Sequence, residues 1–465
     1  MHPHSRRWLL AIATLAIVHA IAFMFYQRPG WATEWDDQVG YQRLGHVLAT
    51  TGTFTRYPDT RPLVPETIRT PGYPMFVAAV YRLFGESHVA VAAAQALLFA
   101  GLTLVTFALT SRLSSERVGL AAAALTALFA PIPYYGALVL TEVLCTVLVT
   151  MALWTAVRAI QEPRLRNYLA TGVLLGLATL TRPTFALFPV ALIASVALAA
   201  AWRGTSRRLW RWSWTVAAFS IVLLPWLAYN AIYVHRLTIS PAGGVGRATW
   251  EASWQGTWSG RVQADLTRLA DAHVNDSDAG LDDAVKRFAQ GTGLPADPML
   301  TYVHQWRDIR RIWETPTDPR ERSIMRVAAD DEYWRAGLAN IRRDRLGHVI
   351  RRVTVGMLVL WIAEIPIRYN EINNVRPFVI RLIWLAQAGL FALALIGLAV
   401  LVNRGHVVEA APLAALIAYI TAVHLPMLAE ARYSLPAKPA VLALAAIAVA
   451  ELAHRILPQT GDYLP

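Results

Sequence analysis

Cysteine and nucleotide-binding signatures are almost absent from this sequence. The one cysteine, Cys145, lies inside an apolar run, which excludes an intrachain disulfide and a zinc site built from several cysteines. No glycine-rich phosphate loop with its lysine occurs, and no closely spaced histidines suggest a metal site. Chemistry on a soluble nucleotide is therefore not expected.

Charge is also scarce, because only 16% of the 465 residues are charged whereas 55% are hydrophobic. The net charge of +12 comes almost wholly from arginines that gather at the ends of apolar runs. Such arginines are typical of membrane flanks, so we expect no nucleic-acid partner. Repeated apolar runs of about bilayer length predict an all-α polytopic membrane protein.

The apolar runs predict about ten transmembrane helices. The first follows a basic amino terminus but lacks a clear cleavage site, so we interpret it as a retained span rather than a signal peptide. The predicted spans are residues 8–26, 88–112, 117–133, 138–157, 168–181, 184–202, 213–234, 379–402, 410–428 and 437–455.

The positive-inside rule predicts the orientation of these spans. Arginines cluster on alternate turns, which predicts that those turns and the amino terminus are cytoplasmic; examples are Arg6, Arg7, Arg112, Arg117, Arg158, Arg164, Arg203 and Arg211. The opposite face then receives two long segments, residues 27–87 and 235–378, where we expect function.

This topology divides the chain into three parts. Residues 1–234 hold seven spans and the external loop 27–87, residues 235–378 form an external cap, and residues 379–465 hold the last spans. The apolar stretch 349–367 is short for a span, so we interpret it as an interfacial helix. If it crossed the membrane, the chain would have eleven spans.

The first external segment contains the candidate reactive groups. Asp37, Tyr41, Leu44 and Leu48 recur at helical spacing and predict an amphipathic helix over residues 37–50, ending near Gly52. Asp36 and Asp37 start this helix, where a carboxylate can also serve as an N-cap.

A second short helix is predicted after Pro71 and Pro74, within RTPGYPMFVAAVYRLFG at residues 69–85. It would place Arg69 and Tyr73 near the same surface. The Arg69 guanidinium could pair bidentately with a phosphate there, or serve as an ordinary interfacial arginine.

These motifs resemble the first external loop of GT-C class glycosyltransferases. The pattern is an acidic residue four before a tyrosine, then G-x-F, R-x-P-G-Y-P and Y-x-L-F-G. It is similar in particular to the bacterial branch with dolichyl-phosphate-mannose protein mannosyltransferase-like and aminoarabinose lipid A transferase-like enzymes. Thr141-Glu142, LATLTRPT around Arg182 and EARYSLPAKP at 430–439 continue the resemblance, which is weak between residues 260 and 340.

The resemblance implies that a first-loop aspartate is the catalytic base, and the motif alignment favours Asp37 over Asp36. It also implies that arginines face a phosphate leaving group, with Arg69 first and Arg432 or Arg182 adding charge. The remaining candidate substrate-binding residues are Tyr41, Tyr73, Glu142, His424, Glu430 and Tyr433. For three candidates a structural role is the alternative: a buried ion pair for Arg182, a helix-dipole contact for Glu142, and a polar collar for His424.

The resemblance implies an inverting glycosyltransferase that moves a monosaccharide from a polyprenyl-phosphate donor to an extracytoplasmic lipid, glycan or protein. A bacterial cytoplasmic (inner) membrane location follows, with the active site on the periplasmic or extracellular face and membrane lipids as partners. No cofactor is indicated, and a divalent metal is left open because the wider class varies. The alternative function is a polytopic transporter or flippase for a glycolipid, with Arg182 and His424 on the substrate path.

The segment after residue 262 is polar and predicts a small external helical cap up to about residue 345. Just before it, Trp250, Trp254 and Trp258 recur every four residues, which suits either sugar stacking or membrane anchoring. A basic strip beside the membrane is predicted to meet anionic lipid or carrier phosphate; it comprises Arg342, Arg343, Arg345, Arg351 and Arg352.

Overall fold

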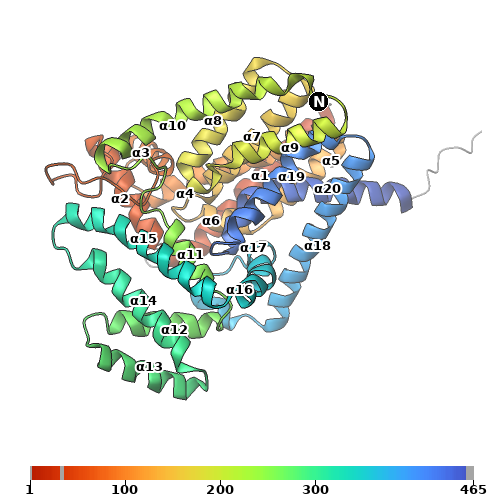
Figure 1. Cartoon of the computed structure of the whole chain (residues 1–465). Coiled ribbons are helices and arrows are strands. Elements are labelled where there is room, and N and C mark those ends of the chain that lie inside the picture. Colours follow the sequence, from red (N-terminus) through yellow and green to blue (C-terminus); the bar gives the residue numbers. More distant parts are fainter. Residues whose placement is uncertain (1–2, 32–35, 457–465) are drawn as a thin grey trace, which may run out of the picture.

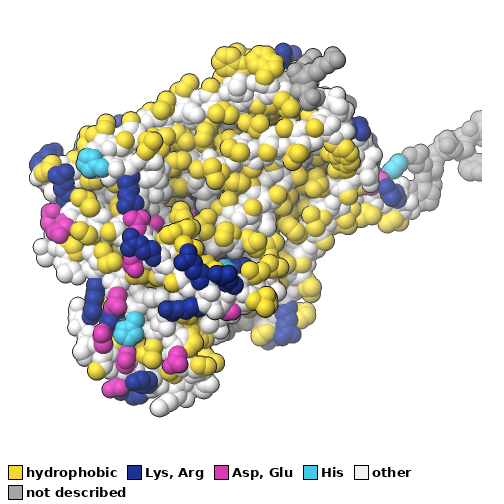
Figure 2. Space-filling model, viewed as in Figure 1, with side chains coloured by type: hydrophobic (Ala, Val, Ile, Leu, Met, Phe, Trp, Pro, Cys, Tyr) yellow, Lys and Arg dark blue, Asp and Glu magenta, His cyan; other side chains and the backbone are white. Residues whose placement is uncertain are grey.

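The computed structural model describes residues 3–31 and 36–456, and within these ranges the chain forms helices and loops without a strand (Figure 1). This confirms the predicted all-α class. Long helices lie side by side in one bundle, and a second group of helices, α11 to α15 (residues 245–343), lies at one end of it. Apolar side chains cover most of the visible bundle surface, whereas most of the visible charged side chains lie over α11 to α15 and over the end of the bundle beside them (Figure 2).

Eight helical segments of the described residues are long and apolar enough to cross a membrane. Four of them are single helices early or late in the chain: α1 (Pro3–Gln27), α4 (His88–Leu113), α7 (Glu142–Gln161) and α18 (Pro377–Asn403). The fifth is α19 (Val407–His424). The other three are helices extended by short 3-10 turns: η2 (Pro183–Phe185) with α9 (Phe188–Trp202), η3 (Ser206–Trp212) with α10 (Ser213–Tyr233), and η6 (Ala431–Ala437) with α20 (Lys438–Ile456).

Shorter helices occupy the other two predicted spans. Helix α8 (Leu165–Thr181) has 17 residues and α5 (Glu116–Leu128) has 13. At 1.5 Å per residue they extend about 26 Å and 20 Å, less than the roughly 30 Å of a hydrocarbon core. The short helix α6 (Pro131–Gly136) follows α5 and completes the predicted span 117–133.

Glycines allow close approach between bundle helices. An added Cβ at Gly397 of α18 would lie 1.9 Å from the Leu444 carbonyl oxygen of α20. One at Gly172 of α8 would lie 2.2 Å from the Thr215 carbonyl oxygen of α10. Inside a bilayer the hydrophobic effect does not drive helices together, because lipid tails are as apolar as the side chains. Close van der Waals packing of this kind therefore stabilises the bundle.

The two helices predicted in the first external segment are present. Helix α2 spans Asp36–Thr51 and α3 spans Gly72–Phe84. Gly52 follows the last residue of α2, and its φ of 71° suits glycine better than other residues. The Gln38 side chain accepts a hydrogen bond from the Val139 backbone at 2.9 Å, which fixes the start of α2 against the loop before α7.

The cap has a core of its own. It comprises α11 (Val245–Trp254), α12 (Gly260–Ala272), α13 (Asp278–Thr292), α14 (Ala296–Glu314) and α15 (Pro319–Arg343). Trp250 is fully buried and stacks on Tyr302, with ring centroids 5.0 Å apart, and Trp254 is buried beside it. Both expectations for Trp250 and Trp254, sugar stacking and membrane anchoring, are therefore wrong, because these rings fill the core of the cap.

The chain between the cap and α18 forms only short elements: α16 (Arg345–Arg351), the π-helical turn η4 (Arg352–Gly356), α17 (Met357–Trp361) and η5 (Tyr369–Asn374). Elements α16, η4 and α17 follow one another without a break over residues 345–361. At about 1.5 Å per residue this helical stretch extends about 26 Å, less than a hydrocarbon core, and it ends before residue 367.

Arg352 is buried, which corrects its place in the predicted basic strip. Its guanidinium donates to the carbonyl oxygens of His424, Leu425 and Met427 and to the Gln255 side chain. Gln255 in turn donates to the Ala429 carbonyl oxygen at 2.7 Å. Arg352 and Gln255 therefore join the cap to the turn that follows α19.

We expect Gly397→Ala to destabilise the bundle by about 1–3 kcal/mol, because the new methyl group would force α18 and α20 apart. Gly389→Ala is the matched control, since Gly389 lies on the same helix with no heavy atom within 4 Å of an added Cβ. Both substitutions gain the same helix propensity, so the difference between their thermal unfolding midpoints in detergent isolates the packing effect. Equal midpoints would contradict close packing at Gly397.

Candidate active site

Five separate segments bring charged side chains together at one end of the bundle. Asp37 lies in the first turn of α2, and Arg69 lies in the loop before α3. Glu142 is the first residue of α7, Arg182 follows the last residue of α8, and Arg432 lies in η6. Each residue stands where a helix begins or ends, so its charge can sit at the edge of the apolar bundle.

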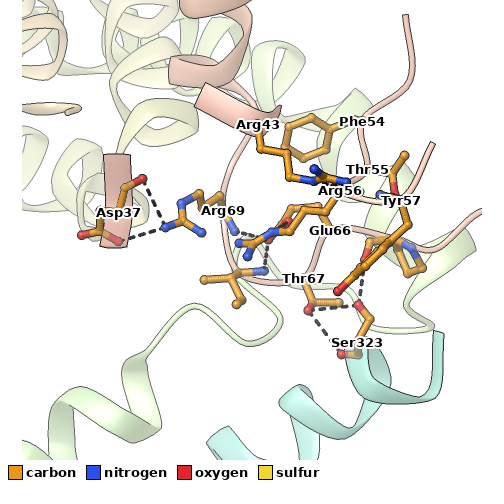
Figure 3. Close-up of polar contacts among 12 residues, drawn as sticks. Asp37, Arg43, Phe54, Thr55, Arg56, Tyr57, Glu66, Thr67, Arg69 and Ser323 are labelled. Carbon is orange, nitrogen blue, oxygen red and sulfur yellow. Dashed lines mark hydrogen bonds and ion pairs between the residues drawn. The ribbon is translucent and has the colours of Figure 1, made fainter. Parts of the chain in front are cut away.

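Asp37 is held between two arginines. Arg69 Nη2 lies 3.0 Å from Asp37 Oδ1, and Arg432 Nη1 lies 3.5 Å from Asp37 Oδ2. The convergence of Asp37 and Arg69 that the first-loop motif suggested is thus present in the structure, and Figure 3 shows the two side chains facing each other.

A second carboxylate shares the same arginines. Glu142 Oε1 lies 3.5 Å from Arg182 Nη1 and 3.7 Å from Arg432 Nη1. Arg432 also pairs with Glu430, with 2.5 Å between its Nε and Glu430 Oε2. Three guanidiniums and three carboxylates therefore form one continuous network.

The carboxylates of Asp37 and Glu142 differ in their exposure to solvent. The Asp37 side chain is 45% exposed, whereas that of Glu142 is 3% exposed. The side chains of Arg69, Arg182 and Arg432 are between 10% and 13% exposed. Asp37 is therefore the acid of this pair that an approaching molecule can reach, and the arginines form the wall behind it.

The arginines also determine the charge of Asp37. Burial by itself would raise the pKa of this carboxyl, but the positive charges of Arg432 and Arg69 outweigh burial. The pKa of Asp37 consequently lies below its ordinary value, and the group is ionised at neutral pH. Without a ligand, Asp37 is thus a stable anion.

Two aromatic residues and one glycine orient Arg69. Its guanidinium lies over the Tyr41 ring, 4.8 Å from the centroid, and an added Cβ at Gly40 would lie 2.4 Å from the Arg69 Cζ. Tyr41 meets Tyr73 edge to face at 5.0 Å. Burial raises the pKa of Tyr41 to about 12, so its hydroxyl stays protonated.

The expected surface position of Tyr73 is wrong. This side chain is fully buried, and its hydroxyl donates to Gln95 Oε1 at 3.1 Å. Tyr73 therefore supports Tyr41 from inside the bundle. The sequence motif could not show this, because a short helix can present its tyrosine to either side.

His424 and Tyr433 lie behind the arginines. Their rings stack with centroids 4.8 Å apart, and His424 is buried. The guanidiniums of Arg182 and Arg432 lie over the Tyr433 ring at 5.3 and 5.5 Å from its centroid. Tyr433 thus helps to hold both arginines near Glu142.

Asp36 begins α2, but its side chain lies outside the part of the chain that the structure describes. Among residues 3–31 and 36–456, no group of three or more histidine, cysteine or acidic side chains is placed to hold a metal ion.

Glu66 is a site residue that sequence reasoning missed. It is buried, pairs with Arg56 at 2.5 Å, and accepts hydrogen bonds from the backbone nitrogens of Ile68 and Arg69 at 2.9 and 3.0 Å. Figure 3 shows Glu66 between Arg56 and Arg69. The only sequence signal was an acid three residues before Arg69, which is too common to single out.

Residues 68–229 match the family described as dolichyl-phosphate-mannose-protein mannosyltransferase. No curated protein matches the sequence. The oligosaccharyltransferase AglB from Archaeoglobus fulgidus, solved with an inhibitory peptide and a dolichol-phosphate, is similar with a TM-score of 0.54 at 13% identity, over 98% of this chain and 51% of AglB. Its apo form gives 0.54 at 14% identity, over 96% and 51%.

ArnT from Cupriavidus metallidurans bound to undecaprenyl phosphate is a more distant match, with a TM-score of 0.39 at 15% identity over 97% of this chain and 80% of ArnT. The chain spans about half the length of the AglB structures. The family match and the AglB fold confirm the predicted resemblance to GT-C membrane glycosyltransferases and the multi-pass helical fold.

We expect Glu66→Gln to lower the free energy of unfolding by about 3 kcal/mol, because Arg56 would lose its buried partner. Burial opposes the charge of Glu66, but Arg56 outweighs it, so the folded-state pKa lies below the ordinary 4.5. The stabilisation by Glu66 is therefore present above about pH 4.5 and is lost as the pH falls through the folded-state pKa.

Thermal unfolding at pH 7 and pH 4 in detergent measures this effect. The variant should lose less stability on acidification than the unchanged chain. Glu332→Gln is the control, because Glu332 forms an exposed pair with Arg335. Equal acid sensitivity in Glu66→Gln and the unchanged chain would contradict the role of the Glu66 carboxylate.

Proposed function

We propose that the chain is an inverting glycosyltransferase that moves a monosaccharide from a polyprenyl-phosphate donor to an acceptor outside the cytoplasm. The observation that carries the proposal is a half-exposed, ionised Asp37 carboxylate flanked by Arg69 and Arg432 at one end of an apolar helical bundle. The match to the mannosyltransferase family and the AglB-like fold support it.

Asp37 would act as the general base. An acceptor hydroxyl has a pKa far above neutral and must lose its proton as it attacks, so a carboxylate within hydrogen-bond reach is required. The proton passes to Asp37, the acceptor oxygen bonds to the anomeric carbon, and the bond from that carbon to the phosphate oxygen breaks. The electron pair leaves with the polyprenyl phosphate.

The arginines would stabilise this leaving group. Guanidiniums match phosphate oxygens in charge and geometry, and Arg69 and Arg432 already stand beside the base. A donor phosphate would compete with Asp37 for their N–H groups. Because these arginines keep the pKa of Asp37 low, donor binding would raise that pKa and make the carboxylate a stronger base.

The distribution of arginines supports a site that faces away from the cytoplasm. Helix α7 begins at Glu142 in the charged network and ends at Gln161. Near that far end, Arg112 pairs with Glu162 at 2.9 Å, and Arg211 donates to the Pro163 carbonyl oxygen at 2.6 Å. Arginine-rich turns mark the cytoplasmic side, so the network at the start of α7 would lie opposite, outside a bacterial inner membrane.

Release of carrier phosphate tests the function. The purified chain is incubated with a polyprenyl-phosphate sugar, with and without a candidate acceptor, and free polyprenyl phosphate is measured. We expect release that depends on the acceptor. Movement of intact donor across a vesicle membrane without bond cleavage would instead support a transporter.

We expect Asp37→Asn to lower kcat by about 10²- to 10⁴-fold, because the amide cannot take the acceptor proton. Asp36→Asn is the matched control on the neighbouring carboxylate and should retain most turnover. If Asp36→Asn abolishes turnover while Asp37→Asn does not, the base is Asp36. If both variants stay active, the mechanism is wrong.

A further inference from the structure

A cleft lies where the first external loop meets the cap. Its lining comes from loop residues 56–67 and from the first turns of α15. The cleft is narrow, with about 10 Å³ of space for water-sized molecules, and it opens to solvent. The lining residues are Arg56, Tyr57, Pro65, Glu66, Thr67, Arg322, Ser323 and Arg326.

Hydrogen bonds fix the two walls of this cleft to each other. Ser323 Oγ donates to the Pro65 carbonyl oxygen at 2.7 Å, and Thr67 Oγ1 donates to the Ser323 carbonyl oxygen at 3.3 Å. Figure 3 shows Ser323 on its helix beside Thr67 and Tyr57 of the loop. The cleft is thus a built feature of the folded chain rather than a gap between loose segments.

Positive charge in the cleft is not balanced. Three arginines and one glutamate line it, so its net charge is +2. Glu66 pairs with Arg56, and Arg322 donates only to a neutral group, the Pro316 carbonyl oxygen, at 3.0 and 3.1 Å. Arg326 forms no ion pair within residues 3–31 and 36–456, and its guanidinium lies 4.4 Å from the centroid of the Trp313 ring.

The surroundings of Arg326 disfavour its charge. Burial lowers the pKa of this guanidinium, and the nearby positive charge of Arg56 lowers it further. A bound anion would relieve both effects, because it would supply an opposite charge and hydrogen-bond acceptors.

We propose that this cleft binds a phosphate group of the acceptor, separate from the hydroxyl that receives the sugar. Arg322 and Arg326 lie one turn apart on α15, whereas Arg56 and Tyr57 approach from the loop. A tetrahedral phosphate accepts hydrogen bonds from several directions, whereas a carboxylate accepts them mainly in one plane, so donors on two walls favour phosphate.

The cleft is also connected to the proposed base. Glu66, in its wall, accepts hydrogen bonds from the backbone of Ile68 and Arg69, and the Arg69 side chain pairs with Asp37. An acceptor held by its phosphate would therefore stand one short loop away from Asp37. This inference rests on the proposed transferase function for the identity of its ligand.

Binding of radiolabelled inorganic phosphate tests the cleft directly. The full chain is placed in nanodiscs of phosphatidylcholine, with chloride used to keep the ionic strength constant. We expect saturable binding, and at least tenfold weaker binding at one site in Arg326→Gln. Arg335→Gln is the matched control, because Arg335 lies on the same helix with a 73% exposed side chain and should bind phosphate as the unchanged chain does.

Arg326→Lys distinguishes the loss of positive charge from a general disturbance of folding at this position. It keeps a cation and should retain more phosphate binding than Arg326→Gln, so equal loss in both variants would overturn the proposal. Absence of saturable binding, or unchanged binding in Arg326→Gln, would also overturn it. Because this measurement needs no turnover, its failure is distinguishable from failure of the transferase function.

Competition identifies the source of the phosphate. Displacement of labelled phosphate by glucose 1-phosphate indicates a soluble phosphorylated glycan. Reduced binding in nanodiscs that contain phosphatidic acid indicates a lipid headgroup. If neither phosphate ester competes in a manner that depends on Arg326, the proposal that the cleft binds a phosphate group of the acceptor is overturned.

Discussion

The need to pair every charge at the edge of an apolar bundle governs this structure. Glu142 is buried at the start of α7, and a lone carboxylate there would cost several kcal/mol. Arg182 and Arg432 supply the opposite charge from distant parts of the sequence. Arg432 also pairs with Asp37, so the arginine that compensates the buried charge of Glu142 also positions the half-exposed acid.

Much of the fold could be predicted from the sequence, because lipid imposes a simple length and polarity rule on each span. The amphipathic helix over residues 37–50 was also predictable, since its apolar spacing and Gly52 fix its face and its end. The motif resemblance brought Asp37, Arg69, Glu142, Arg182 and Arg432 into one candidate set. Only the folded structure shows which of these residues form ion pairs with one another.

The features that the sequence did not predict depend on contacts between residues far apart in the chain, which no local sequence pattern identifies. Trp250 and Trp254 have the spacing of a helix face, but that spacing is the same whether the face meets lipid, sugar or protein. In the sequence, Arg352 resembles any other basic residue beside the membrane. In the structure it is buried and donates hydrogen bonds to three carbonyl oxygens more than 70 residues along the chain. Glu66 and Gly40 matter through Arg69, which is visible only once the loop has folded.

The link through Arg352 and Gln255 has a practical consequence for protein engineering. These two side chains hold the turn that leads from α19 to Glu430 and Arg432. The cap is thus part of the scaffold of the charged network rather than a detachable module. Shortening the chain by excising residues 245–343, or grafting a cap from a relative, would leave that turn without its Gln255 brace and loosen the arginine that serves both acids.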